Sequence, residues 1–381
     1  MAKLGMPTVV VKFIEAGIEA IQRSQRGIVA LILEDTKQVI DKLATKTNGH
    51  EVLPNPFLVY TVDDIPEELS DKNKDYILKA LKGYNKPPLK VVVYMMQQGG
   101  DKAGADRFQE PLKAMLTEHF DYLAIPTIET AQLEYVATWV KTARENKFKK
   151  IKVVLPGSNA DYEGVINFGN TKVVTADREY KAAEYTARIA GLVAGTNMTQ
   201  SATYAPLTEV IDCDRHTQDE MDTMVNEGKF FIWYDGEKFK MSRAMNSLVT
   251  TSQGKLEGYQ TIKIVDIMDM IYDDIRKTAQ DSYIGKYTND YENKCLLISA
   301  ILGYFKQLEN ERLLQKDYST CEIDCEAVRT YQLSHGLFTK EELAKMTDDE
   351  VKKLDTKKIV FLKAKVRPLD AMEDIQLPIN I

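Results

Sequence analysis

The sequence predicts a mixed α/β protein with an open α/β layer in the middle, an α+β domain in the C-terminal half, and extended β-strand arms at the N- and C-termini. Between residues 89 and 206, apolar runs of strand length alternate with helical stretches, which is the order of an α/β layer. Residues 207–367 combine amphipathic helices with short strands. Both chain ends have the apolar and polar alternation of a strand.

Composition places the chain among folded, globular proteins. Its 381 residues predict roughly two to three domains, and a hydrophobic content of 44% is enough to build cores. The net charge of −7, with both signs interspersed, argues against direct binding to nucleic acid or to an anionic membrane. No stretch approaches the ~18 apolar residues of a membrane span, and the N-terminus lacks the features of a signal peptide. We expect a chain that is made and kept in the cytoplasm.

The four cysteines do not indicate a disulfide framework or a metal site. They are Cys213, Cys295, Cys321 and Cys325. They are few and scattered, as in proteins of a reducing compartment. The close pair in CEIDC lies in a predicted strand, which would place both thiols on one face without further ligands nearby. We interpret Cys321 and Cys325 as ordinary buried thiols, and we expect neither a metal nor a cofactor.

The N-terminal region predicts strands followed by short helices. Residues 7–13 are rich in β-branched side chains, and a strand there would place Val9, Val11 and Phe13 on one face. The fully apolar run at 27–33 predicts a buried strand. Helices are expected at 35–43 and 73–81.

The middle of the chain predicts the α/β layer and a helix that closes it. Strands are expected at 89–96, 122–126, 151–156 and 171–175, with helices at 110–119 and 129–146. The closing helix has a bulky stripe of Tyr185, Ile189 and Leu192 and a small stripe of Ala187, Gly191 and Gly195. A glycine inside a helix costs about 1 kcal/mol relative to alanine. The two glycines therefore indicate that another backbone, expected to be the sheet, lies against the small stripe.

The C-terminal half predicts further helices and strands. Helices are expected at 218–226, 261–283 and 290–315, a hairpin turn at Asp235 and Gly236, a strand at 321–333, two capped helices within 339–354, and strands at 359–366 and 374–381. In the 261–283 helix, the expected core stripe is Ile264, Met268, Ile271 and Ile275. The opposite face carries Asp269, Asp273 and Asp274, which we interpret as a solvated acidic face.

The two chain ends need a sheet to pair with. A strand over the last residues, DIQLPINI, would place Ile375, Leu377, Ile379 and Ile381 on one face. An apolar-faced strand at a terminus has to be tied into something. In one alternative the ends pair in cis with each other or with the chain's own sheet. In the other they leave the body and complete the sheets of neighbouring copies through backbone hydrogen bonds. The residues alone leave both alternatives open.

No recognisable active site accompanies the predicted α/β layer. Gly99, Gly100 and Gly104 lack the spacing of a dinucleotide-binding loop, and no phosphate-binding loop follows any strand. Ser158 lacks the G-x-S-x-G motif, and the four histidines are isolated from one another. We therefore expect a protein that is not an enzyme. A small-molecule-binding α/β enzyme, with its terminal strands paired in cis, is the alternative.

Three stretches resemble contractile phage tail sheath proteins, which also occur in phage-tail-like bacteriocins and defective prophages. ARIAGLVAGTNMTQSATYAPL resembles the signature segment of this family, with its AG-x-x-AG core followed by a polar run and an extended link. GMPTVVVKFIEAGIEAIQRSQRGIVALILED, near the start, and KIVFLKAKVRPLDAMEDIQLPINI, at the end, match in the same order. The three matches together span most of the chain.

The resemblance implies a structural subunit that polymerises helically around an inner tube and contracts to drive the tube through the target cell envelope. The implied partners are other copies of the chain in hexameric rings stacked into a sheath, the inner tail tube protein, and the baseplate and tail terminator proteins. Neither direct nucleic-acid binding nor membrane insertion is implied. The subunit would be made in the bacterial host cytoplasm and end in a virion or a phage-tail-like particle. A baseplate component of the same particle is a third interpretation.

The resemblance also implies roles for parts of the chain. The expected segments are an N-terminal strand arm at 1–26, the N-terminal part of the body at 27–88, an α/β sheet domain at 89–206, a C-terminal α+β domain at 207–367, and a C-terminal strand arm at 368–381. The arms would link subunits through Val9, Val11, Phe13, Ile375, Leu377, Ile379 and Ile381. Asp269, Asp273 and Asp274, in the implied tube-facing half, are possible tube contacts. Flexible joints are expected near 22–27 and 368–373.

Overall fold

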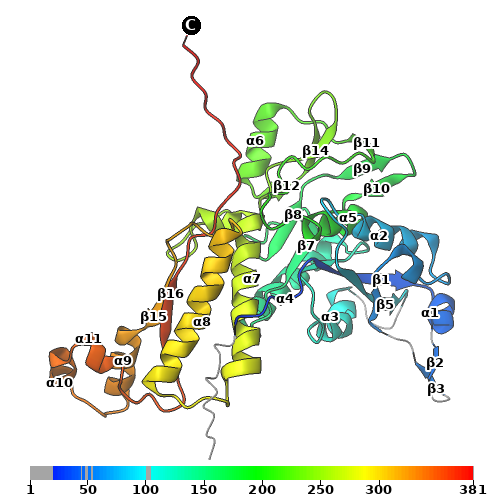
Figure 1. The fold of residues 1–381 in the computed structure, drawn as a ribbon. Helices are drawn as coiled ribbons and strands as arrows, with labels where there is room; N and C mark the ends of the chain where they lie inside the picture. The colour runs from blue at the N-terminus through cyan, green and yellow to red at the C-terminus, as the bar shows by residue number, and fades with distance from the viewer. Residues whose placement is uncertain (1–19, 44, 48–49, 53–54, 100–103, 381) are drawn as a thin grey trace, which may run out of the picture. The chain divides into compact units, whose positions relative to one another are not determined.

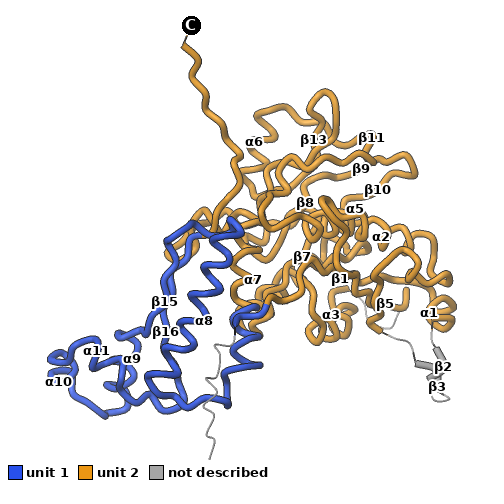
Figure 2. Tube along the Cα trace, in the orientation of Figure 1, with its two compact units in different colours: residues 1–22, 274–367 blue, residues 23–273, 368–381 orange. Residues whose placement is uncertain are grey.

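The computed structural model describes residues 20–43, 45–47, 50–52, 55–99 and 104–380, which fall into two compact units (Figures 1 and 2). The sheet unit is Arg23–Asp273 with Pro368–Ile381, and the helical unit is Asp274–Arg367 with Met1–Gln22. The division into five segments stays a prediction. None of the helices in the described ranges has the length and apolar character needed to cross a membrane.

Within the described residues, the sheet unit is built on a seven-stranded, mostly parallel sheet, which confirms the predicted α/β layer (Figure 1). The strand order is β12-β8-β7-β6-β1-β5-β4, and only β4 runs antiparallel to its neighbour. The strands are β1 (Ile28–Asp35), β4 (Phe57–Val59), β5 (Lys90–Gln97), β6 (Tyr122–Ala124), β7 (Lys152–Pro156), β8 (Val165–Phe168) and β12 (Lys229–Phe230).

Helices cover both faces of this sheet, which explains the continuous apolar sequence of β1. One face is covered by α2 (Asp71–Leu81) and α5 (Ala182–Ala194), and the other by α3 (Gln109–Met115) and α4 (Leu133–Asn146) (Figure 1). Val29, Leu31 and Leu33 belong to the first core, whereas Ile28, Ala30 and Ile32 belong to the second. Alternate residues of a strand point to opposite faces, so a strand buried on both sides is apolar throughout.

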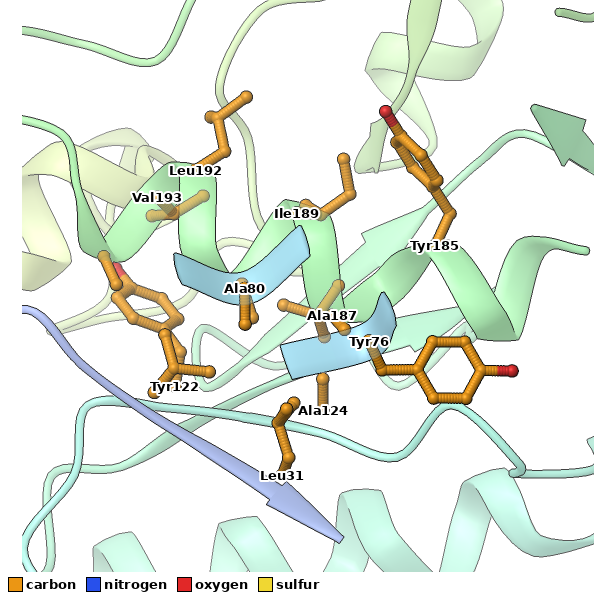
Figure 3. Close-up of a cluster of buried hydrophobic side chains, with 14 of the residues drawn as sticks. Leu31, Tyr76, Ala80, Tyr122, Ala124, Tyr185, Ala187, Ile189, Leu192 and Val193 are labelled. Carbon is orange, nitrogen blue, oxygen red and sulfur yellow. The ribbon is translucent and has the colours of Figure 1, made fainter. Parts of the chain in front are cut away.

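At Gly191, the small stripe of α5 faces the helix α2, so the expectation that the sheet lies against this glycine is wrong. A Cβ added at Gly191 would lie 2.0 Å from the carbonyl oxygen of Ala80, which belongs to α2. Only a residue without a side chain lets the two helix backbones come this close. Ala187, on the same helix, lies with Leu31 and Ala124 of the sheet in one buried cluster (Figure 3).

The strand expected at 171–175 forms, but it does not belong to the large sheet. β9 (Lys172–Thr175) pairs antiparallel with β10 (Glu179–Lys181) and β11 (Val210–Cys213) in a small separate sheet. The position beside β7 is taken by β8, which the sequence did not predict. Residues 169–171 alone link β8 to β9, which is too short a connection to bring β9 back parallel to β8 in the same sheet.

The predicted helix at 218–226 and the predicted hairpin after it both form. α6 (Gln218–Asn226) begins with a capping box of Thr217 and Glu220. The predicted hairpin is β13 (Ile232–Tyr234) with β14 (Phe239–Met241). Its turn is centred one residue later than expected, because the Asp235 N–H donates to the Lys238 carbonyl at 3.1 Å. The other elements are α1 (Lys37–Leu43), β2 (Thr45–Thr47), β3 (His50–Val52), and the 3₁₀ turns η1 (Val62–Asp64), η2 (Gly104–Phe108), η3 (Thr130–Gln132) and η4 (Glu257–Gln260).

In the helical unit, the predicted strand at 321–333 is largely wrong. α7 (Ile262–Thr278) runs across the boundary of the two units, and the helical unit continues with a π-helical turn η5 (Ala279–Tyr283), α8 (Tyr291–Asn310), β15 (Thr320–Ile323), α9 (Cys325–Ser334), α10 (Lys340–Lys345), α11 (Asp348–Val351) and β16 (Leu362–Lys365). β15 ends at Ile323 because the next residue, Asp324, caps α9 by accepting from the Ala327 N–H. Cys321 and Cys325 therefore lie in different elements. The two capped helices are confirmed, with capping boxes at Thr339 and Thr347.

Candidate functional site

The C-terminal segment presents its apolar side chains to solvent. Ile375, Leu377 and Ile379 are 83%, 75% and 75% exposed, and residues 374–380 form no strand in the single chain. The expected terminal strand is therefore absent from the isolated subunit. Of the other expected linking residues, Val9, Val11, Phe13 and Ile381 lie outside the described residues.

The acidic residues of α7 are buried, so their interpretation as a solvated face is wrong. The exposed fractions of Asp269, Asp273 and Asp274 are 3%, 8% and 0%. In the expected core stripe, by contrast, Met268, Ile271 and Ile275 are only partly buried, although Ile264 is buried. The burial of the carboxylates follows from their partners, which lie on distant segments of the chain.

Asp269 is held by two buried cations of the sheet unit. The two terminal nitrogens of Arg144 donate to its two carboxylate oxygens at 2.9 Å each, and Lys152 Nζ donates to Oδ2 at 2.8 Å. Arg144 lies near the end of α4 and Lys152 starts β7. This pairing could not be predicted from the sequence, because Arg144 and Lys152 lie 125 and 117 residues from Asp269 along the chain.

A third cation, Arg26, extends the cluster to the start of the central strand β1. Arg26 donates to Asp121 at 2.7 Å, to Asp273 at 2.8 Å and to the backbone carbonyl of Asp269 at 2.7 Å. β1, β6 and β7 all begin next to this cluster, since Val29, Tyr122 and Lys152 lie in register near the starts of these strands. The cluster thus joins α7 to the amino edge of the parallel sheet. Asp274, in the helical unit, instead accepts a hydrogen bond from the Tyr304 hydroxyl at 2.6 Å.

The electrostatics of the cluster are those of a fixed ion-pair network. Burial alone raises the pKa of Asp269, but Lys152 and Arg144 outweigh it and lower that pKa to about 2. Burial raises the pKa of Asp266, which accepts from the Tyr122 hydroxyl at 2.5 Å and pairs with Lys152 at 2.9 Å. The charged groups of this cluster pair with one another, and these ion pairs hold α7 in place.

A second partly buried ion pair fixes α5. Arg188 Nε donates to Glu209 at 2.6 Å, and Lys82 Nζ lies 2.9 Å from the other carboxylate oxygen of Glu209. Burial raises the pKa of Glu209, but Arg188 more than compensates and the pKa falls to about 2.

The ion pair of Arg188 and Glu209 predicts that the folded protein loses stability in acid. The folded-state pKa of Glu209 lies below its unfolded value of 4.5, so its contribution is complete above pH 4.5 and is lost as the pH falls towards 2. We expect the urea midpoint of the wild-type protein to fall over this range, and Glu209→Gln to reduce that fall. The pKa of Asp269 is lowered in the same way, so Asp269 also makes stability fall in acid. Glu209→Gln should therefore reduce the pH dependence of the urea midpoint without abolishing it. Glu237→Gln, on the exposed hairpin turn, is the control, and equal pH dependence of Glu209→Gln and wild type would contradict the prediction.

A polar hollow lies at the carboxyl edge of the sheet, where an α/β enzyme would bind its ligand. This hollow of about 420 Å³ is lined by Thr130, Leu133, Glu134, Ala137, Thr138, Lys141, Gly157, Ser158, Asn159, Ala160 and Tyr162. These lining residues include neither a histidine nor a cysteine that could activate Ser158 or act as a nucleophile. The Ser158 N–H donates to the Asn167 side chain at 2.9 Å, which fixes the turn after β7.

Comparison with known proteins assigns the family. Residues 101–247 match the family model of the phage tail sheath protein central domain, and residues 255–381 match that of the phage tail sheath C-terminal domain. The chain is 32% identical over 382 residues to the tail sheath protein of Clostridium phage phiCD119, with 99% of each chain covered.

Solved structures of sheath proteins share the fold. The sheath tail protein of Desulfitobacterium hafniense is 19% identical, with a TM-score of 0.67 over 83% of this chain and 94% of that one. The helical sheath of the anti-feeding prophage in its contracted state is 12% identical, with a TM-score of 0.68 over 99% of both chains. The matched family is one of structural proteins, which decides against the enzyme alternative. The chain therefore belongs to the phage tail sheath protein family and is a subunit of the contractile sheath of a phage tail or phage-like particle.

Proposed function

We propose that this subunit polymerises helically around an inner tube and that its two end segments link neighbouring subunits by strand pairing. The observation that carries the proposal is the C-terminal segment, whose apolar side chains alternate with polar ones and lie exposed. Such a segment can add to the edge of another sheet, where backbone hydrogen bonds give affinity and alternate side chains give specificity. The N-terminal residues Val9, Val11 and Phe13 have the same sequence pattern and the same proposed role.

The small sheet of the helical unit is a suitable acceptor for a donated strand. Among the described residues, β15 pairs only with β16, over Thr320–Ile323 and Leu362–Lys365. A two-stranded sheet is marginally stable by itself, and each outer edge offers unpaired backbone groups. Strands from neighbouring subunits would complete it.

Strand donation also explains how an array could change shape and stay connected. A head-to-tail contact that does not close into a ring propagates as a helix. Contraction requires two packings of the same rigid body and a link that survives the change. Under this proposal, hexameric rings stack through the end segments, contraction drives the inner tube through the target envelope, and the array ends at baseplate and terminator proteins. The tube contact at Asp269, Asp273 and Asp274 stays a prediction, and their burial gives it no support.

Removal of residues 375–381 tests the proposal. We expect the full-length chain to form tubes or stacked rings in negative-stain electron microscopy. The truncated chain is expected to stay monomeric with an unchanged circular dichroism spectrum, because the removed residues are exposed in the single chain. A matched pair of variants separates the two faces: Leu377→Ser with Ile379→Ser should block assembly, whereas Gln376→Ser with Asn380→Ser should permit it. Normal assembly of the truncated chain would refute strand donation by this segment.

A further inference from the structure

The C-terminal segment is attached to the sheet unit through two consecutive carboxylates. Glu373 Oε1 accepts hydrogen bonds from Thr203 Oγ1 at 2.6 Å and from Ser201 Oγ at 3.2 Å. Arg243 Nη2 donates to Asp374 Oδ1 at 2.5 Å, and Arg243 Nε lies 3.4 Å from Glu373 Oε2. Hydrogen bonds between charged partners are stronger than neutral ones. Two hydroxyls and one guanidinium therefore hold this point of the segment.

Backbone amides orient the two hydroxyl groups that contact Glu373. The Ala244 N–H donates to Thr203 Oγ1 at 2.9 Å, and the Thr203 N–H donates to Ser201 Oγ at 3.1 Å. The two hydroxyl oxygens lie 2.8 Å apart. Because Thr203 Oγ1 already accepts from an amide, its proton is available for Glu373. The arrangement is a receptor for a carboxylate.

This receptor is fixed to the core of the sheet unit. Two backbone hydrogen bonds of 2.9 Å, from the Leu207 N–H to Phe239 and from the Met241 N–H to Ala205, join the chain after Thr203 to β14. Ala205 and Leu207 are fully buried. Tension applied to Glu373 would therefore be transmitted to the packed core of the sheet unit.

The boundary between held and unheld chain falls directly after Asp374. The side chain of Glu373 is only 15% exposed, that of Asp374 is 74% exposed but pairs with Arg243, and Ile375 is 83% exposed. No hydrogen bond or ion pair of residues 375–380 is found within the described part of the chain. The flexible joint expected at 368–373 thus ends at Glu373, which is held by hydrogen bonds to Ser201 and Thr203.

We propose that Ser201, Thr203 and Arg243 form a clip that holds Glu373 and Asp374, so that the strand offered to another subunit begins at Ile375. The purpose of the clip rests on the proposed strand donation. It sets where the donated strand leaves the body, and it passes tension in that strand to the core. Without the clip, tension would first detach residues 368–374 from the sheet unit, and the link between subunits would become longer and looser.

Hydrogen exchange of the full-length monomer tests the clip directly. The double variant Glu373→Gln with Asp374→Asn removes both charges, and we expect the amides of Thr203 and Ala244, which donate to the two clip hydroxyls, to exchange about three- to tenfold faster than in wild type. Arg243→Gln should have the same effect from the other side of the contact. Asp370→Asn is the matched control, because it makes the same chemical change in the same segment without touching the clip, and its exchange should equal wild type. Wild-type exchange in both the double variant and Arg243→Gln would overturn the proposal.

The experiment separates the clip from strand donation. Exchange is measured on the monomer, at a concentration below that at which the chain assembles, so its result does not depend on assembly. If the chain lacking 375–381 assembles normally, strand donation fails while a faster exchange in the clip variants still supports the clip. If truncation blocks assembly but exchange is unchanged, donation stands and the clip is refuted.

Discussion

Replacing Gly191 with alanine is expected to destabilise the sheet unit by at least about 3 kcal/mol, at the upper end of what overpacking costs. The added Cβ would lie 2.0 Å from the Ala80 carbonyl oxygen and 2.7 Å from its carbonyl carbon. These are backbone atoms inside α2, so no side-chain rotation can relieve the overlap, and the two helices would have to move apart. The measurement is the urea midpoint, together with the yield of soluble protein.

A second helical glycine provides the control for this variant. Gly303 lies in α8, and a Cβ added there would meet no atom within 4 Å. Gly303→Ala should therefore stabilise its helix by up to about 1 kcal/mol, through helix propensity alone. If Gly191→Ala left the urea midpoint at the wild-type value, the close packing of α5 on α2 would be wrong.

Removing the carboxylate of Asp269 is the second change with a large expected effect. Asp269→Ala leaves Arg144 and Lys152 without their shared partner, although their side chains are only 5% and 1% exposed. Breaking a buried ion pair from one side costs about 3–5 kcal/mol, because the remaining charges stay buried. We expect the urea midpoint of the sheet unit to fall accordingly.

An exposed aspartate shows what burial adds to this effect. Asp349 pairs with Lys352 at 3.0 Å, but its side chain is 84% exposed. Asp349→Ala should change stability by no more than about 0.5 kcal/mol, because exposed pairs are well solvated. Equal, small effects of Asp269→Ala and Asp349→Ala would show that the cluster beside α7 does not stabilise the fold.

The sequence by itself determined those features whose cause lies within a few residues. The run at 28–33 had to be a strand buried on both faces, because every residue in it is apolar and none is polar enough to face water. The capping boxes at Thr339 and Thr347 fixed two helix starts, since each threonine and its glutamate lie three residues apart. The stretches that resemble sheath proteins gave the family, which the matches over most of the chain confirmed.

Only the tertiary structure decided which segments meet. Asp269 was interpreted as solvated because its charge was visible and its partners were not: Arg144 and Lys152 lie 125 and 117 residues away along the chain. The glycine at position 191 indicated a close backbone contact, but it did not indicate whether a sheet or a helix makes that contact. Glu373 gave no local sign of its role, since its hydroxyl donor on Thr203 lies 170 residues away. Patterns along a sequence report local conformation and burial, whereas the identity of a distant partner depends on how the whole chain folds back on itself.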